Sequence, residues 1–167
     1  MRVISFNGEQ VTLHDEQLKV GDKLPHVDLF DNNMTVFKTE GTKGIRVFLT
    51  VPSLDTPICD QEVRTFNEKA AELPGVSIYA VSVDLPFAQA RWCGTANVKA
   101  VKTISDYNGA EFGRATGTYI SEFALLARAV FIVDAEGTVV YVEILDDVNS
   151  HPDYQAAYYQ LNELIGG

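Results

Sequence analysis

Residues 45–73 read IRVFLTVPSLDTPICDQEVRTFNEKAAEL and contain the pattern that decides the fold. Ile45 to Val51 is a short apolar run, typical of a strand buried on both faces of a sheet. From Asp60 to Leu73 apolar residues recur at helical spacing, and Pro74-Gly75 is expected to end this helix. A buried strand that leads through a short loop into a helix is a unit from which α/β proteins are built.

Strand and helix patterns continue on both sides of this unit. Asn7-Gly8 separates two strand-like runs, Val3 to Phe6 and Val11 to Leu13, and predicts an N-terminal hairpin with room for Glu9-Gln10 in its turn. Gly94 is expected to end the helix that starts at Pro86. The remaining expected elements are loops and short strands at 21–44, strands at 76–83, 101–104, 129–133 and 139–144, a turn at 134–137, and helices at 86–93, 111–115 and 153–165.

This order of elements predicts an α/β fold with a central mixed β-sheet flanked by helices and an N-terminal β-hairpin. The order is similar to that of the thioredoxin fold. The chain of 167 residues has no internal repeat, low-complexity segment or linker. We therefore expect a single domain over residues 1–167.

Composition narrows the classes of partner. The net charge is −10, from 23 acidic and 13 basic side chains, which argues against nucleic acid and against anionic membrane surfaces. No apolar run approaches the length of a membrane span. Polar and turn residues interrupt the first residues before the core of a signal peptide could form, so a cytoplasmic location is expected.

The chain has two cysteines, Cys59 and Cys93. They could be a pair of buried, inert thiols, because free cysteine packs as a small apolar side chain. A metal site is not indicated, since His14, His26 and His151 are scattered without the spacing of metal ligands. The third interpretation is redox chemistry, and the local sequence has to decide between them.

Cys59 lies between the predicted strand and the predicted helix. Thr56 is a good N-cap residue, and Pro57 suits the first helical position, where its missing N–H would be unpaired anyway. Cys59 then falls in the first helical turn, where free backbone N–H groups and the helix dipole favour a thiolate. The alternative is that Cys59 only packs against Val63 and Phe66, one and two turns further on.

Three segments carry a resemblance to a known family. Pro52-x-x-x-Thr56-x-x-Cys59 matches the active-site motif of the peroxiredoxins, and the fuller string PSLDTPIC resembles their thiol peroxidase subfamily. Residues 83–94, VDLPFAQARWCG, resemble the helix that carries the resolving cysteine in that subfamily. Residues 127–134, ARAVFIVD, resemble its arginine-bearing strand. The segments occur in the family's order, and the likeness runs from the N-terminal hairpin to the final helix.

The resemblance implies a thiol-dependent peroxidase that reduces hydrogen peroxide and organic (alkyl) hydroperoxides. In such an enzyme the Cys59 thiolate attacks the peroxide and becomes a sulfenic acid, which Cys93 resolves as an intrachain disulfide with Cys59. The likeness also implies that Arg128 lies near the Cys59 sulfur, that the Thr56 hydroxyl contacts the thiolate and the bound peroxide, and that Pro52 shields the pocket. On the residues alone, Arg128 could instead extend into solvent from the end of its strand.

The same resemblance implies thioredoxin as the reductant, a homodimer, and no metal, flavin or haem, because sulfur itself carries the electrons. Two other classes of function compete with this one. A thioredoxin-like disulfide exchanger would need a Cys-x-x-Cys pair, whereas 33 residues separate the two cysteines here. A redox-sensing module would use the thiol only as a switch.

Two further expectations concern the surroundings of the cysteines. Arg64 and Arg91 are expected to be solvated surface charges. Nothing in the sequence makes Cys59 and Cys93 neighbours in the reduced fold, so the segment around Cys93 is expected to move before a disulfide can form.

Overall fold

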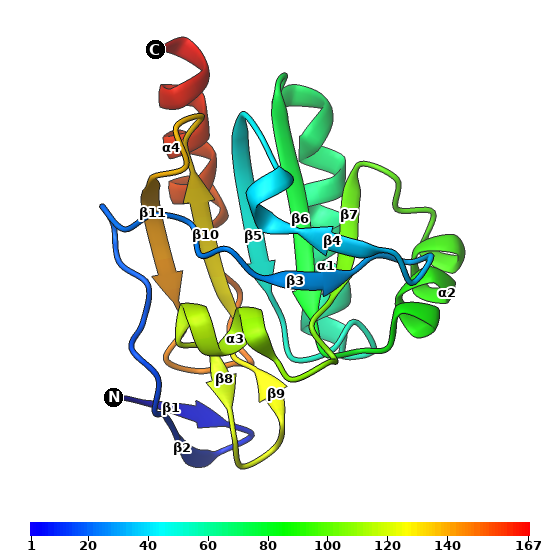
Figure 1. Ribbon diagram of the computed structural model, residues 1–167, viewed down its shortest axis with the longest axis vertical. Helices are drawn as coiled ribbons and strands as arrows, with labels where there is room; N and C mark the ends of the chain where they lie inside the picture. Colours follow the sequence, from blue (N-terminus) through cyan, green and yellow to red (C-terminus); the bar gives the residue numbers. More distant parts are fainter.

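A computed structural model describes residues 1–167, and a seven-stranded mixed sheet forms its centre (Figure 1). The strands follow the order β11-β10-β5-β6-β7-β3-β4 across the sheet. Their bounds are β3 Asp28–Phe30, β4 Val36–Lys38, β5 Ile45–Thr50, β6 Val76–Ser82, β7 Val101–Ser105, β10 Ala129–Val133 and β11 Val139–Ile144. The expected α/β class with a mixed central sheet is confirmed.

Parallel and antiparallel pairs divide the sheet. β5, β6 and β7 are parallel, and helices α1 (Pro57–Lys69) and α2 (Pro86–Ala96) provide the crossovers that parallel neighbours require. β10 is antiparallel to β5, and the turn that follows it brings β11 back beside it. On the other side, β3 runs antiparallel to β7 and pairs with β4.

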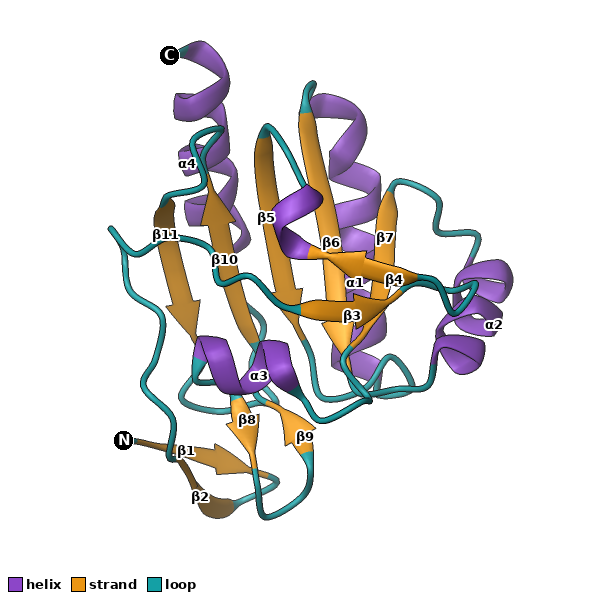
Figure 2. Cartoon of the chain, in the orientation of Figure 1, coloured by secondary structure: helices purple, strands orange, loops and turns teal.

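Side chains alternate between two apolar cores, one on each face of the sheet. Val47 and Leu49 of β5 face helices α1 and α4 (Tyr154–Gly166), while Phe48 faces the opposite core. Figure 2 shows α1 and α4 together behind the sheet and the short helix α3 (Glu111–Thr116) in front of it. None of these helices combines the length and apolar character needed to cross a membrane.

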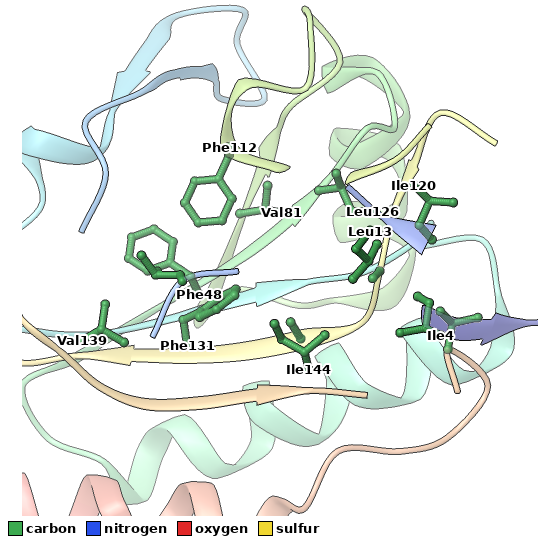
Figure 3. Close-up of a cluster of buried hydrophobic side chains, with 14 of the residues drawn as sticks. Ile4, Leu13, Phe48, Val81, Phe112, Ile120, Leu126, Phe131, Val139 and Ile144 are labelled. Carbon is green, nitrogen blue, oxygen red and sulfur yellow. The ribbon is translucent and has the colours of Figure 1, made fainter. Parts of the chain in front are cut away.

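The front core extends beyond the sheet to two small hairpins. These are β1 (Arg2–Phe6) with β2 (Glu9–Leu13), and β8 (Tyr119–Ile120) with β9 (Leu125–Leu126). Figure 3 shows Ile4 and Leu13 of the first hairpin and Ile120 of the second in one cluster with Phe131 of the central sheet. Burial of this apolar surface therefore fixes the N-terminal hairpin against the rest of the fold.

The N-terminal hairpin is tighter than expected. Asn7 and Gly8 alone make the turn, with φ of 52° and 85°, the left-handed pair that a two-residue hairpin turn favours. Glu9 and Gln10 pair within the ladder, so their place in the turn was a wrong expectation. Ser5 in β1 also bonds the segment after β11, since its N–H donates to the Asp146 carbonyl at 2.7 Å.

Helix α2 is longer than the glycine rule predicts. It continues through Gly94 to Ala96 and ends at Asn97, which adopts the left-handed conformation with φ of 57°. A glycine inside a helix costs only about 1 kcal/mol, which tertiary contacts can offset, so Gly94 does not end this one. Cys93 thus lies inside the last turn of α2 and not at its end.

Candidate active site

The start of α1 has the expected geometry at Cys59. Thr56 occupies the N-cap position with extended backbone, and Pro57 is the first helical residue. The first intrahelical donor is Asp60, whose N–H donates to the Thr56 carbonyl at 3.0 Å. The N–H groups of Ile58 and Cys59 therefore precede the helical hydrogen bonds, and they place the positive end of the helix dipole beside the sulfur.

Arg128 lies in the segment between β9 and β10 and is buried. Its Nη2 donates to the Cys59 Sγ at 3.2 Å, and its Nη1 donates to the Glu62 Oε1 at 2.7 Å. Its Nε donates to the Val148 carbonyl at 2.8 Å. The alternative in which Arg128 extends into solvent is therefore wrong, because all three sides of the guanidinium are bonded inside the protein.

The backbone around Arg128 is fixed by neighbouring strands. The Thr50 hydroxyl of β5 donates to the Ala127 carbonyl at 2.8 Å, and the Leu145 N–H donates to the Arg128 carbonyl at 3.0 Å. Val148, which accepts from the guanidinium, is itself held by the N-terminal hairpin through its N–H to the Ser5 carbonyl at 3.1 Å. Contacts with β5, with the segment after β11 and with the N-terminal hairpin thus hold the guanidinium in position beside the sulfur.

Glu62 is the functional candidate that sequence reasoning missed. Its side chain is fully buried, and its Oε2 has no hydrogen-bond partner. Burial raises the pKa of Glu62 to about 7, with the charge and hydrogen bond of Arg128 acting in the opposite direction. The signal was present in the sequence, since Glu62 shares the buried helix face with Cys59, Val63 and Phe66, where a carboxylate needs a partner.

Arg128 keeps its proton in this environment. Burial by itself lowers the pKa of the guanidinium, but the adjacent Glu62 and Cys59 outweigh burial and raise it above the ordinary value. A permanent cation therefore lies between a carboxyl group and a thiol, and it stabilises negative charge on either of them.

A cavity of about 320 Å³ adjoins this cluster. Arg128 and Thr56 contribute polar groups to its wall, and Pro52 lines it as expected. The full lining is Phe6, Asn7, Pro52, Thr56, Pro57, Ile58, Arg128, Val148 and Asn149. Cys59 has no exposed surface and does not line the cavity, but Arg128, which bonds its sulfur, does. The cavity walls come from the N-terminal hairpin, the loop before α1, the start of α1, the segment between β9 and β10, and the segment after β11.

Asp84 organises the loop that carries Pro52 and Thr56. Its carboxylate accepts from the Ser53 hydroxyl at 2.8 Å and from the Leu54 N–H at 2.9 Å. The Thr56 hydroxyl donates to the Ser53 carbonyl at 3.0 Å and makes no capping bond to α1. The contact of Thr56 with the thiolate and the peroxide stays a prediction, with its oxygen lone pairs available at the cavity wall.

Cys93 belongs to a separate environment. Both cysteines are free thiols, and the Cys93 sulfur lies 3.2 Å from the Thr103 hydroxyl of β7. The two sulfurs thus have different partners, Arg128 for Cys59 and Thr103 for Cys93. No group of three or more His, Cys, Asp or Glu side chains has the arrangement of a metal site.

Contacts between α1 and α2 link the two cysteine segments. The Trp92 indole N–H donates to the Asp60 carboxylate at 2.8 Å, so the neighbour of Cys93 is bonded to the neighbour of Cys59. Arg64 is partly exposed as expected, but it also pairs with Asp60 at 2.9 Å and lies 5.8 Å from the centre of the Trp92 ring. Arg91 is exposed.

The chain is similar to known proteins over most of its length. A family model described as Redoxin matches residues 19–158. The thiol peroxidase of Clostridium acetobutylicum is 50% identical over 151 residues, which cover 90% of this chain and 92% of that protein. The thiol peroxidase of Bacillus subtilis is 44% identical over 156 residues, 93% of each chain. The crystal structure of a peroxiredoxin-like protein from Aquifex aeolicus is similar with a TM-score of 0.92 and 38% identity, covering 98% of each chain.

Proposed function

We propose that Cys59 is the peroxide-attacking residue of this chain, which belongs to the Redoxin family, among the thiol peroxidases, and reduces peroxides by thiol chemistry. The observation that carries the proposal is the 3.2 Å contact between the Arg128 guanidinium and the Cys59 sulfur beside an otherwise mainly apolar cavity. A buried sulfur bonded to a permanent cation is stabilised as the thiolate, which is the nucleophilic form.

The proposed reaction begins with the Cys59 thiolate attacking one oxygen of the hydroperoxide. A sulfur–oxygen bond forms as the O–O bond breaks, so sulfur is oxidised to the sulfenic acid, and the leaving oxygen takes up a proton from solvent to become water or an alcohol. Arg128 and the free N–H groups at the start of α1 stabilise the charge that grows on the leaving oxygen. Thr56 orients the peroxide from the cavity wall, and Pro52 keeps bulk water out.

Resolution is proposed to use Cys93. Its thiolate attacks the sulfenic sulfur, a disulfide forms within one chain as the S–OH bond breaks, and the released hydroxide takes up a proton to become water. Because the two sulfurs have separate partners, α2 has to leave its position first. Its attachment supports such a movement, since only Pro86 and Gln89 among its residues are fully buried, while Trp92 and Ala96 pack half-buried against the core.

The substrate and reductant follow from the same proposal. The apolar residues Phe6, Ile58 and Val148 in the cavity wall favour organic hydroperoxides in addition to hydrogen peroxide. A dithiol protein has to reduce the disulfide, and thioredoxin is the proposed reductant. We also infer a homodimer in the cytoplasm, as expected for proteins similar to this one.

A pair of cysteine variants tests the proposal against a disulfide exchanger and a redox sensor. Cys59→Ser is expected to abolish peroxide turnover, since a serine hydroxyl is a far weaker nucleophile at neutral pH. Cys93→Ser is expected to consume the first peroxide at the wild-type rate but not to be recycled, because thioredoxin has no disulfide to reduce.

The readouts are peroxide consumption with thioredoxin and mass spectrometry of the products. Sulfinic acid is expected to accumulate at Cys59 in Cys93→Ser under excess peroxide. Substantial thioredoxin-dependent turnover by Cys59→Ser would refute the role of Cys59. A wild-type disulfide that links two chains would refute resolution within one chain.

A further inference from the structure

Cys93 is the end of a hydrogen-bonded chain that reaches across the edge of the sheet. Its sulfur lies 3.2 Å from the Thr103 Oγ1, and the same Oγ1 donates to the Asn32 Oδ1 at 3.0 Å. Thr103 is buried in β7, and Asn32 belongs to the turn between β3 and β4. The turn between β3 and β4 is thus connected through Thr103 of β7 to the thiol of α2.

These two hydrogen bonds determine which atom carries each proton. A threonine hydroxyl has one proton, and here that proton goes to Asn32, whose carbonyl oxygen can only accept. The Thr103 oxygen then has only lone pairs to offer to Cys93. The contact at 3.2 Å is therefore a bond in which the Cys93 S–H donates, and it exists only while the thiol is neutral.

The charged groups of α1 that face the Cys93 segment have partners of their own: Asp60 accepts from the Trp92 indole N–H at 2.8 Å, and Arg64 pairs with Asp60 and donates to the Ala96 carbonyl at 3.3 Å. The nearest charged residue on α2 is Arg91, whose side chain is exposed. Lys102 precedes Thr103, but its Nζ lies 5.3 Å from the centre of the Phe37 ring, on the opposite face of the strand. Asp31, beside Asn32, accepts from backbone N–H groups of its own turn.

We propose that Asn32 and Thr103 hold Cys93 as a neutral thiol on β7, so that it becomes a nucleophile only after α2 has left the sheet. The inference rests on the proposed role of Cys93 as the resolving residue. Asn32 and Thr103 are positioning residues, because they act through the Cys93 proton and touch neither peroxide nor Cys59.

The chemical sequence follows from this placement. Once Cys59 is a sulfenic acid and α2 detaches, Cys93 leaves the Thr103 oxygen and releases its proton to water. The thiolate then forms the sulfur–sulfur bond, the S–OH bond breaks, and the hydroxide takes up a proton to become water. Before that moment the docked thiol is protected from electrophiles and oxidants, which react with the thiolate.

The test measures alkylation of Cys93 by iodoacetamide as a function of pH in a Cys59→Ser background, where Cys93 is the only thiol. Asn32→Ala removes the acceptor, so the Thr103 proton can turn to the sulfur and stabilise the thiolate. We expect alkylation at neutral pH to become about fivefold faster, the effect of one hydrogen bond, and the pH midpoint of alkylation to fall. Asn33→Ala, an exposed neighbour in the same turn, is the matched control and is expected to leave both unchanged.

Two further variants separate a proton effect from simple loosening of α2. Thr103→Val in the Asn32→Ala background is expected to abolish the fall in the midpoint, since the hydroxyl that moves is absent, whereas Thr103→Ser is expected to retain it. Loosening alone would raise the alkylation rate by the same factor at every pH. An unchanged pH midpoint of alkylation in Asn32→Ala would overturn the proposal. A higher midpoint would overturn it too, because it would mean that the Asn32 amide donates to Thr103 in the wild type.

A second measurement uses the chain with both cysteines. Asn32→Ala is expected to accelerate disulfide formation after one equivalent of peroxide, followed by mass spectrometry of quenched samples. A lower alkylation midpoint without faster disulfide formation would overturn the proposal that Asn32 and Thr103 control when Cys93 attacks the sulfenic acid. Failure of Cys93 as the resolving residue is detected separately, by normal recycling of Cys93→Ser with thioredoxin.

Discussion

The substitution Glu62→Gln is the most direct test of the buried cluster formed by Cys59, Glu62 and Arg128. The carboxylate is fully buried, one of its oxygens accepts from Arg128 at 2.7 Å, and the other has no partner. Glutamine keeps the volume and the acceptor oxygen, but it cannot ionise. The variant therefore resembles the protonated form of Glu62 at every pH.

The size of the effect follows from the pKa. Burial raises the pKa of Glu62 from 4.5 to about 7, so the folded state binds this proton more tightly than the unfolded chain does. The stability contributed by the protonated form is complete below pH 4.5 and is lost as the pH rises through 7. The total is roughly 3 kcal/mol, and most of it falls between pH 5 and pH 8.

The measurement is urea unfolding of the reduced protein, followed by circular dichroism between pH 5 and pH 8. The free energy of unfolding of Glu62→Gln, relative to wild type, is expected to increase by roughly 2 to 3 kcal/mol over this range. Glu68→Gln, an exposed position on the same helix, is the control and is expected to follow wild type. Parallel pH profiles for Glu62→Gln and wild type would refute the reasoning, because Glu62 would then not take up a proton on folding in this range.

Two other predictions concern the contacts of the cysteine segments. Arg128→Lys is expected to slow the reaction of Cys59 with peroxide by about tenfold to a hundredfold. A lysine ammonium cannot bond both the Glu62 carboxylate and the Cys59 thiolate, and a charge-assisted hydrogen bond is worth about 1.5–3 kcal/mol. An unchanged rate in stopped-flow experiments would remove Arg128 from the site. Trp92→Phe removes the N–H that donates to Asp60 but keeps an aromatic ring, so α2 is expected to detach more readily and the disulfide with Cys93 to form about fivefold faster. Slower disulfide formation in quenched mass spectrometry would contradict this account of the link between α1 and α2.

The regular elements were predictable from the sequence because local signals decide them. The apolar run at residues 129–133 and the one at 139–144 match β10 and β11 in their bounds. Errors occurred where tertiary contacts decide the outcome. Gly94 is an ordinary helical residue because α2 is held by contacts with the sheet and with α1, and those contacts are not visible in a local pattern.

In the candidate site, too, local features could be predicted from the sequence and long-range contacts could not. The placement of Cys59 at a helix start could be read from Thr56 and Pro57, because capping is a local property. The partners of Arg128 could not, since Glu62 and the Val148 carbonyl reach it only after α1 and the segment after β11 pack together. Long-range hydrogen bonds of this kind depend on the whole topology.

The cavity beside Arg128 has a consequence for chemists who design covalent inhibitors. Its volume of about 320 Å³ lies at the small end of ligand pockets, and the target sulfur has no exposed surface. A bulky thiol reagent therefore cannot reach Cys59 without opening the fold. A compact electrophile with an anionic group to meet the guanidinium and an apolar tail against Phe6 and Ile58 would combine fit with selectivity for this cysteine over Cys93.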